Sequence, residues 1–145
     1  GLGFDAHRFA PERPLTLAGV RLRDRDGLAG HSDADVVCHA VIDALLGAAG
    51  LDDIGTVFPD TNPAYSEADS VGLLGSAVRL LHEHGWVPVN VDVVVICEET
   101  RIAPHREAMR IRLASALGVE GDQVAVKGKT TEGLGFTGRG EGIAT

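Results

Sequence analysis

The residues best suited to chemistry stand at the start of the chain, where Asp5 and His7 lie two positions apart. In an extended segment, such residues project from the same face, about 7 Å apart along the strand, while their neighbours point the other way. A carboxylate and an imidazole that look into one space are candidate metal ligands. The question is whether a third ligand arrives from elsewhere.

His39, in the middle of a predicted helix, is the candidate third ligand. A lone helical histidine is more often a packed or solvated residue, but Asp5 and His7 favour the ligand reading. Three mixed nitrogen and oxygen ligands leave the fourth position of a zinc ion open to water or substrate. Asp35 can share the helix face of His39. Asp43, one turn beyond, is expected to accept a hydrogen bond from the His39 ring and orient it.

A second constellation is KGKTTEGLGFTGRGEG, residues 127–142, in which glycines alternate with Lys127, Lys129 and Arg139. Backbone amides and cations there could approach phosphate oxygens closely. The segment is not a Walker loop, because Gln123 stands where that motif needs its first glycine. The alternative is a tight hairpin whose glycines merely take positive φ.

Glu132 sits beside two threonines in this glycine-rich segment. A carboxylate in a phosphate loop is costly unless a divalent cation lies between the two anions. Glu132 is therefore a candidate ligand for a hard metal ion such as Mg²⁺.

The residues His31, Ser32 and Asp33 directly precede the predicted helix. A helix N-terminus offers free N–H groups and positive potential, so His31 and Ser32 would suit a phosphate oxygen. The alternative is plain capping by Ser32 or Asp33. The segment 52–62 could be a substrate lid or a solvated connection.

Hydrophobic patterning indicates the elements that position these residues. Expected strands or extended segments lie at 3–9, 14–22 (a strand or hairpin arm), 86–99, 123–131 and from 140 to the end of the sequence. Expected helices run from 32 or 33 to about 50, from 70 to 84 with Ser70 as cap, and from Pro104 to Gly118. Residues 51–68 are expected to form an irregular loop. This order predicts an α+β fold, a mixed β-sheet with helices packed on one face.

Composition favours one compact domain over residues 1–145, although both ends look trimmed; the chain is 44% hydrophobic and 23% charged. A formal charge of -8 without a run of cations argues against a nucleic-acid partner. No apolar run reaches the roughly 20 residues of a membrane span. Cys38 and Cys97 lie in apolar runs, which favours free thiols and a cytoplasmic location. An anionic substrate would then need a metal ion.

Four stretches in this order closely resemble the 2-C-methyl-D-erythritol 2,4-cyclodiphosphate synthase family: GFDAHRF, GHSDADVVCHAVIDALLGAAGLDDIGTVFPDTNPAY, APHREAM and KTTEGLGFTGRGEGIA. The resemblance spans nearly the whole chain. It implies a Bacillus chorismate mutase-like fold, a homotrimer with active sites between subunits, and a central apolar cavity. It also implies a metal-dependent phosphorus–oxygen lyase of non-mevalonate isoprenoid biosynthesis. Such an enzyme converts 4-diphosphocytidyl-2-C-methyl-D-erythritol 2-phosphate to the cyclodiphosphate and releases CMP.

Matched position by position, the resemblance assigns roles to individual residues. Asp5, His7 and His39 match the ligands of one zinc ion, and Glu132 matches the ligand of a Mg²⁺ or Mn²⁺ ion between the α- and β-phosphates. His31 and Thr130 match positions that stabilise the transition state. The methylerythritol phosphate side corresponds to Ser32, Asp53, Ile54, Gly55, Phe58, Pro59, Asp60, Thr61 and Asn62. The cytidine pocket corresponds to Cys97, Glu98, Glu99, Thr100, Arg101, Ile102, Ala103, Lys129 and Thr131. Phe136 and Arg139 match further substrate or ligand contacts.

Two other functions remain open at this point. A zinc-dependent phosphohydrolase of a nucleoside diphosphate-linked substrate would use water in place of the internal phosphate as attacker. A non-enzymatic trimer would hold isoprenoid diphosphates without turnover. The first predicts linear products, and the second predicts retention of the ligand.

Overall fold

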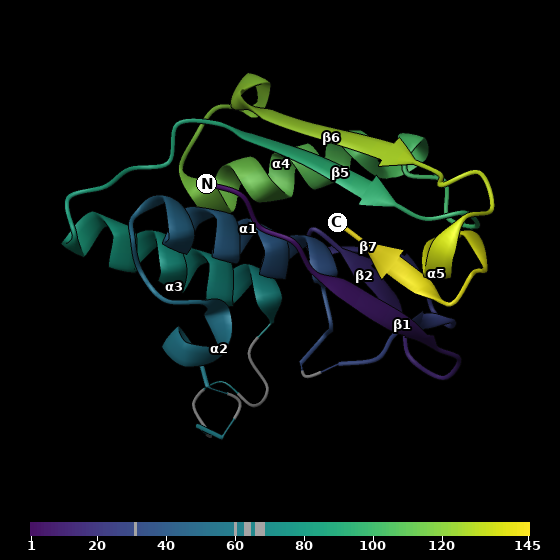
Figure 1. Ribbon diagram of the computed structural model, residues 1–145. Coiled ribbons are helices and arrows are strands. Elements are labelled where there is room, and N and C mark those ends of the chain that lie inside the picture. The colour runs from purple at the N-terminus through teal and green to yellow at the C-terminus, as the bar shows by residue number, and fades with distance from the viewer. Residues whose placement is uncertain (31, 60, 63–64, 66–68) are drawn as a thin grey trace.

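The computed structural model describes residues 1–30, 32–59, 61–62, 65 and 69–145. It forms a mixed α+β fold in which a curled sheet is flanked by three long helices (Figure 1). The strands are β1 (Ala6–Ala10), β2 (Leu15–Leu17), β3 (Val20–Arg23), β4 (Gly27–Leu28), β5 (Val91–Ile96), β6 (Val124–Lys129) and β7 (Gly142–Ala144). The helices are α1 (Val36–Ala48), α2 (Ile54–Val57), α3 (Ser70–Glu83), α4 (Arg106–Leu117) and α5 (Gly135–Gly138), with 3₁₀ turns η1 (Ala103–His105) and η2 (Gly121–Gln123).

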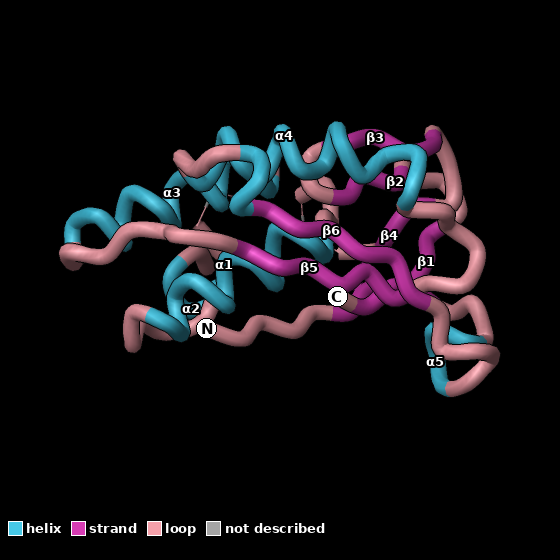
Figure 2. Tube along the Cα trace, turned by 90° about the horizontal axis from the view of Figure 1, so that it is seen from above, coloured by secondary structure: helices cyan, strands magenta, loops and turns pink. Residues whose placement is uncertain are grey.

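The main sheet has five strands in the order β4-β1-β7-β5-β6. β5 and β6 run parallel and the other neighbours are antiparallel, so the sheet is mixed, as predicted. Along β5 and β6, Val93, Val95 and Val126 are buried while Asp92 and Lys127 are exposed. The buried face packs against α1 and α4, and α3 packs against both helices (Figure 2). This alternation of buried and exposed side chains agrees with the prediction that helices cover one face of the sheet.

β2 and β3 form a separate two-stranded hairpin, which resolves the predicted strand or hairpin arm at 14–22. Its turn residues Ala18 and Gly19 both have positive φ, and their amides donate to the carboxylate of Asp35 over 2.8 and 2.6 Å. The same fully buried carboxylate accepts from the amides of Val37 and Cys38. Asp35 therefore fastens the hairpin turn to the first turn of α1.

The predicted caps of both site-bearing helices were wrong by one to three positions. Asp35 caps α1, in place of Ser32 or Asp33, because the chain before it passes through positive φ at Ser32 and is not yet helical. Asp35 also accepts from the first free amides of α1, and the phosphate contact expected of His31 and Ser32 at this N-terminus stays a prediction. Asp69, not Ser70, caps α3 by accepting from the amide of Gly72.

The segment 51–68 was predicted to be wholly irregular, but residues 54–57 form one helical turn, α2. Asp53 caps α2 by accepting from the amide of Thr56 over 2.9 Å. The third predicted helix is confirmed, since it ends at Gly118 with φ +70°. The glycine-rich segment after β6 is not a hairpin: it contains α5 and leads to β7, which pairs with β1 and β5.

The core is filled by aliphatic side chains of the hairpin, the three long helices and the sheet, including Leu17, Leu46, Leu74, Leu113 and Ile143. Cys38 and Cys97 are both buried and free, as predicted. Burial raises the pKa of each thiol, and most strongly that of Cys38. Within the described ranges, no helix has the length and apolar character needed to cross a bilayer.

Candidate active site

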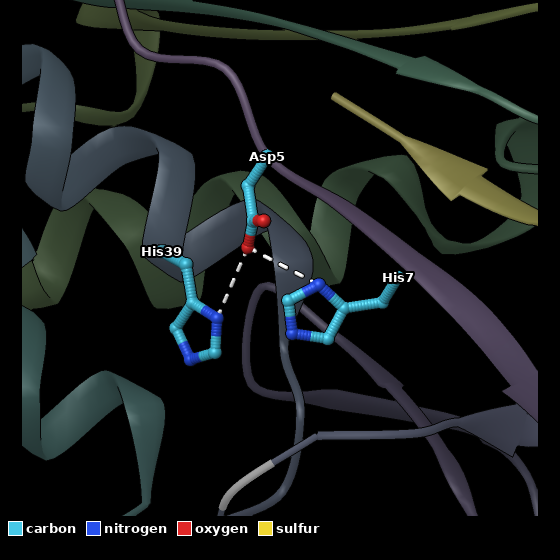
Figure 3. Close-up of side chains that lie close together, drawn as sticks. All are labelled: Asp5, His7 and His39. Atoms are coloured by element: carbon cyan, nitrogen blue, oxygen red, sulfur yellow. Dashed lines mark hydrogen bonds and ion pairs between the residues drawn. The ribbon is translucent and has the colours of Figure 1, made fainter. Parts of the chain in front are cut away.

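Asp5, His7 and His39 come together as the sequence predicted (Figure 3). Asp5 Oδ2 lies 3.2 Å from Nδ1 of His39 and 3.3 Å from Nδ1 of His7. One ligand atom from each of the three lies within 4.8 Å of the others, and they form the one such group among the residues that the structure describes. The three side chains are partly buried.

The arrangement fits a zinc ion. Tetrahedral zinc with ligands at roughly 2.0–2.2 Å separates neighbouring ligand atoms by about 3.3–3.6 Å, and the two distances from Asp5, 3.2 and 3.3 Å, lie near the lower end of that range. In addition, Nδ1 of His7 is buried and has no well-aligned hydrogen-bond partner. A buried nitrogen without a partner is costly in protein alone but is satisfied by a cation.

The electrostatics of the three residues agree with cation binding. Burial alone raises the pKa of the Asp5 carboxyl, but the imidazoles of His39 and His7 and the amide of Ala6 outweigh it and hold that pKa well below its usual range. The adjacent Asp5 carboxylate raises the pKa of His7, against a smaller opposite effect of burial. Asp5 is therefore an anion wherever the protein is folded near neutral pH.

Close backbone packing places Asp5 beside the helix. A Cβ at Gly3 would lie 1.9 Å from the carbonyl oxygen of Ala40, and one at Gly1 would lie 1.7 Å from that of Ala44, so the leading segment lies directly on α1. Asp5 is also held by backbone hydrogen bonds in both directions with Thr145, 3.2 and 3.0 Å long. Only residues without side chains allow this approach.

A cavity of about 390 Å³ opens in front of the three ligands. Ser32, Ile54, Gly55 and Phe58, all predicted for the methylerythritol phosphate side, line it. Asp53, Pro59, Thr61 and Asn62 do not line it, and Asp53 is used as the cap of α2. The predicted residues His31 and Asp60 lie outside the described residues.

Three residues around this cavity differ from expectation. Asp43 does not orient His39: its Oδ1 accepts from the amide of Ile54 over 2.8 Å and so anchors α2 at the cavity. Tyr65, which sequence reasoning missed, lines the cavity and packs edge-on against Phe58 at 5.4 Å between ring centres. The second ring nitrogen of His39 contacts Ser70, also missed, over 3.1 Å. Tyr65 could have been found as an aromatic residue in an otherwise polar loop. For Ser70, the sequence held no indication beyond the predicted role as a cap.

A second cavity of about 410 Å³ lies at the carboxyl ends of β5 and β6. Of the residues predicted for the cytidine pocket, Cys97, Glu98, Thr100, Arg101, Ile102, Ala103 and Lys129 line it, joined by Arg106, Gly128 and Thr130. Glu99 and Thr131 do not. Thr131 instead donates its amide to Glu98 Oε1 over 2.8 Å, which fixes the acidic side chain of Glu98 within the protein.

Thr130 lines this second cavity, and its Oγ1 donates over 2.6 Å to Oε1 of Glu132, which does not itself line the cavity. Glu132 is exposed and has φ +53°. A single exposed carboxylate suits Mg²⁺, which is commonly held by one or two carboxylates together with substrate phosphates.

Phe136 and Arg139 line neither cavity. Phe136 belongs to a third, apolar cavity shared with Phe4, Ile96 and Leu134. Arg139 is exposed and pairs with Glu141 through two hydrogen bonds of 2.7 and 3.1 Å. Within a single chain, Phe136 and Arg139 therefore lie apart from the metal-ligand cavity and from the nucleotide cavity.

The YgbB family model matches residues 1–145. The chain belongs to the YgbB family. It is 60% identical to the 2-C-methyl-D-erythritol 2,4-cyclodiphosphate synthase of Rubrobacter xylanophilus, over 99% of this chain and 88% of that protein. The enzyme of the same name from Symbiobacterium thermophilum is 54% identical, over 99% and 92% of the two chains.

Solved structures agree with this YgbB-family assignment. A CDP-bound 2C-methyl-D-erythritol-2,4-cyclodiphosphate synthase superposes with a TM-score of 0.91 at 35% identity, over 99% of this chain and 93% of that one. The bifunctional IspDF of Campylobacter jejuni gives 0.94 at 43% identity, over 99% of this chain but 39% of that one. The fold of the YgbB-family chain is thus shared along its full described length.

Proposed function

We propose that this YgbB-family protein is a single-domain, metal-dependent phosphorus–oxygen lyase that forms 2-C-methyl-D-erythritol 2,4-cyclodiphosphate in isoprenoid biosynthesis. The substrate is 4-diphosphocytidyl-2-C-methyl-D-erythritol 2-phosphate. An oxygen of its 2-phosphate forms a bond to the β-phosphorus, the bond from that phosphorus to the α-phosphate oxygen breaks, and CMP leaves. The observation that carries this proposal is the Asp5, His7 and His39 group at the mouth of a cavity, in a chain 60% identical to a synthase of this name.

The chain supplies position and charge rather than a nucleophile, as phosphoryl transfer requires. Asp5, His7 and His39 would hold the first metal, and Glu132, which accepts from the hydroxyl of Thr130, would hold the second. When bound, Zn²⁺ would polarise the β-phosphate and Mg²⁺ or Mn²⁺ would neutralise charge on the departing CMP. The hydroxyl of Thr130 donates to Glu132 here, and it would be free to donate to a phosphate oxygen once a metal ion occupies that carboxylate. In a protein of charge -8, this local neutralisation is what admits a polyanion.

We further propose that the protein works as a homotrimer whose sites form between subunits. Among the described residues, the metal-ligand cavity and the nucleotide cavity share no lining residue: the first is lined by residues of β1, α1 and α2, and the second by residues that end or follow β5 and β6. In the substrate, however, a single α-phosphate separates the β-phosphate from the cytidine. The metal half of one subunit and the nucleotide half of its neighbour must therefore meet. The two buried free thiols suit a cytoplasmic enzyme.

Product analysis tests the reaction. Incubation with the cytidine substrate, zinc and magnesium should yield CMP and the cyclic diphosphate in equal amounts. A linear methylerythritol product would instead indicate the phosphohydrolase, and retention without turnover would indicate the binding module. His39→Ala should lose zinc and CMP release together. His82→Ala, which removes an exposed histidine of α3, is the matched control and should keep both.

Subunit complementation tests the shared site. His39→Ala and Glu132→Gln each disable one half of every site, so each homotrimer should be inactive. Co-expressed variants that assort at random would restore about a quarter of the sites, because each interface needs one intact half from each of two subunits. No recovery in mixed trimers would place both halves of a site in one subunit.

A further inference from the structure

We propose that Ser70 and Asp33 are positioning residues for the metal site: they fix the proton of His39 on Nε2 and leave Nδ1 free to bind the metal. This inference rests on the proposed function, because it concerns the ligand set described above. The sequence motifs suggested only helix caps for Ser70 and Asp33, and neither residue belongs to the three metal ligands.

Ser70 is fully buried at the first turn of α3 and faces His39. Its Oγ lies 3.1 Å from Nε2 of His39 and donates a hydrogen bond to Oδ1 of Asp33. The backbone amide of Ser70 donates to Oδ2 of the same carboxylate over 3.2 Å. Ser70 is therefore held at both its backbone and its side chain by Asp33.

The surroundings of Asp33 are those of an acceptor. Besides the amide and hydroxyl of Ser70, the amide of Asp35 lies 3.3 Å from Oδ1 and the hydroxyl of Ser32 lies 3.4 Å from it. All four groups can donate, and an ionised carboxylate can only accept. The single proton of the Ser70 hydroxyl is thus directed to Asp33.

It follows that Ser70 must accept in its contact with His39. An imidazole that donates from Nε2 carries its lone pair on Nδ1. That atom is the one 3.2 Å from Asp5 and turned toward the ligand group (Figure 3). A metal ion at Nδ1 would replace the contact between this nitrogen and Asp5 and would leave the proton on Nε2, where Ser70 accepts its hydrogen bond. Partners of this kind commonly contribute 10- to 100-fold to metal affinity.

Ser70→Ala removes the acceptor, and we expect zinc to bind roughly 10- to 100-fold more weakly in competition with a chromophoric chelator. Asp33→Asn is a second variant with a different prediction about mechanism. Its amide can donate to Ser70, which frees the hydroxyl to donate to Nε2 and favours the proton on Nδ1. Zinc affinity should fall although shape and size are kept.

A spectroscopic measurement separates positioning from general support. In the zinc-loaded protein, ¹⁵N NMR of His39 should show a slowly exchanging Nε2–H and a metal-bound Nδ1. Ser70→Ala should make that proton exchange quickly. Ser76→Ala, on the exposed side of the same helix, is the matched control and should leave both affinity and signal unchanged.

The outcomes are distinguishable. If Ser70→Ala lowers the melting temperature but keeps wild-type zinc affinity and the His39 signal, Ser70 is only structural and the inference is wrong. If the zinc-loaded wild type carries the metal on Nε2 of His39 and the proton on Nδ1, the inference is also wrong. A wild-type protein that binds no zinc would instead overturn the proposed function.

Discussion

Gly30 offers a sharp test of the geometry at His7. A Cβ built at Gly30 would lie 2.9 Å from both Cδ2 and Nε2 of the His7 ring and 3.0 Å from the Cβ of Ala34. Gly30 is not among the residues with positive φ, so alanine is allowed by the backbone and the effect of Gly30→Ala is steric.

The size of the effect follows from these distances. Carbon atoms in ordinary contact stay about 3.5–4.0 Å apart, so the His7 ring must move by roughly 0.6–1.1 Å. Metal–ligand distances tolerate only about 0.2 Å. We therefore expect zinc affinity to fall by roughly 10- to 100-fold, or about 1.4–2.7 kcal/mol. Overpacking should also lower the stability of the metal-free protein by about 1–3 kcal/mol.

Zinc affinity is measured by chelator competition, and stability by urea denaturation of the metal-free protein. Gly47→Ala is the control: it lies on α1, the helix that carries His39, and its added methyl group meets nothing within 4 Å. It should keep zinc affinity and stabilise α1 by up to about 1 kcal/mol. Wild-type zinc affinity in Gly30→Ala would show that the His7 ring does not rest against Gly30 in the metal-bound protein.

Three further changes test other parts of the structure. Asp35→Ala leaves four buried or partly buried amides without their acceptor, and it should lower the free energy of unfolding in urea by more than about 4 kcal/mol. Asp53→Ala removes an exposed cap with one hydrogen bond and should lower it by about 1 kcal/mol. Equal losses in the two variants would contradict the role of Asp35. Asp43→Ala frees the amide of Ile54 and should raise KM severalfold while zinc affinity stays constant, as steady-state kinetics and chelator competition would show. Because burial raises the pKa of Cys38 well above the usual thiol value, iodoacetamide at pH 8 should leave it unmodified in the native protein and label it in urea, as read by mass spectrometry.

The ligand group was predictable because its signal is local. Asp5 directly precedes β1 and His7 lies on it, two positions later, while His39 stands on a strongly apolar helix, so their types and spacing sufficed. The order of the main elements was predictable for the same reason. The extended segment expected from residue 140 contains β7, but the partners of this strand, β1 and β5, could not be predicted from its three residues.

The caps and the supporting residues could not be predicted from spacing. Several potential acceptors stand in a row before α1, and Asp35 is selected because it also binds the hairpin turn, seventeen residues earlier in the chain. Ser70 meets His39 across thirty-one positions. Asp43 has the spacing to orient His39 but binds the amide of Ile54. In each case a long-range contact decides between locally equivalent choices.

The buried carboxylate of Asp35 couples the local unfolding of two parts of the molecule. Because one side chain closes both the reversal between β2 and β3 and the start of α1, neither can open while the other stays shut. The β2–β3 hairpin and the start of α1 should thus unfold as one cooperative unit, and this unit includes His39. The stability of the metal-binding group therefore depends on the β2–β3 turn, although that turn contributes no metal ligand.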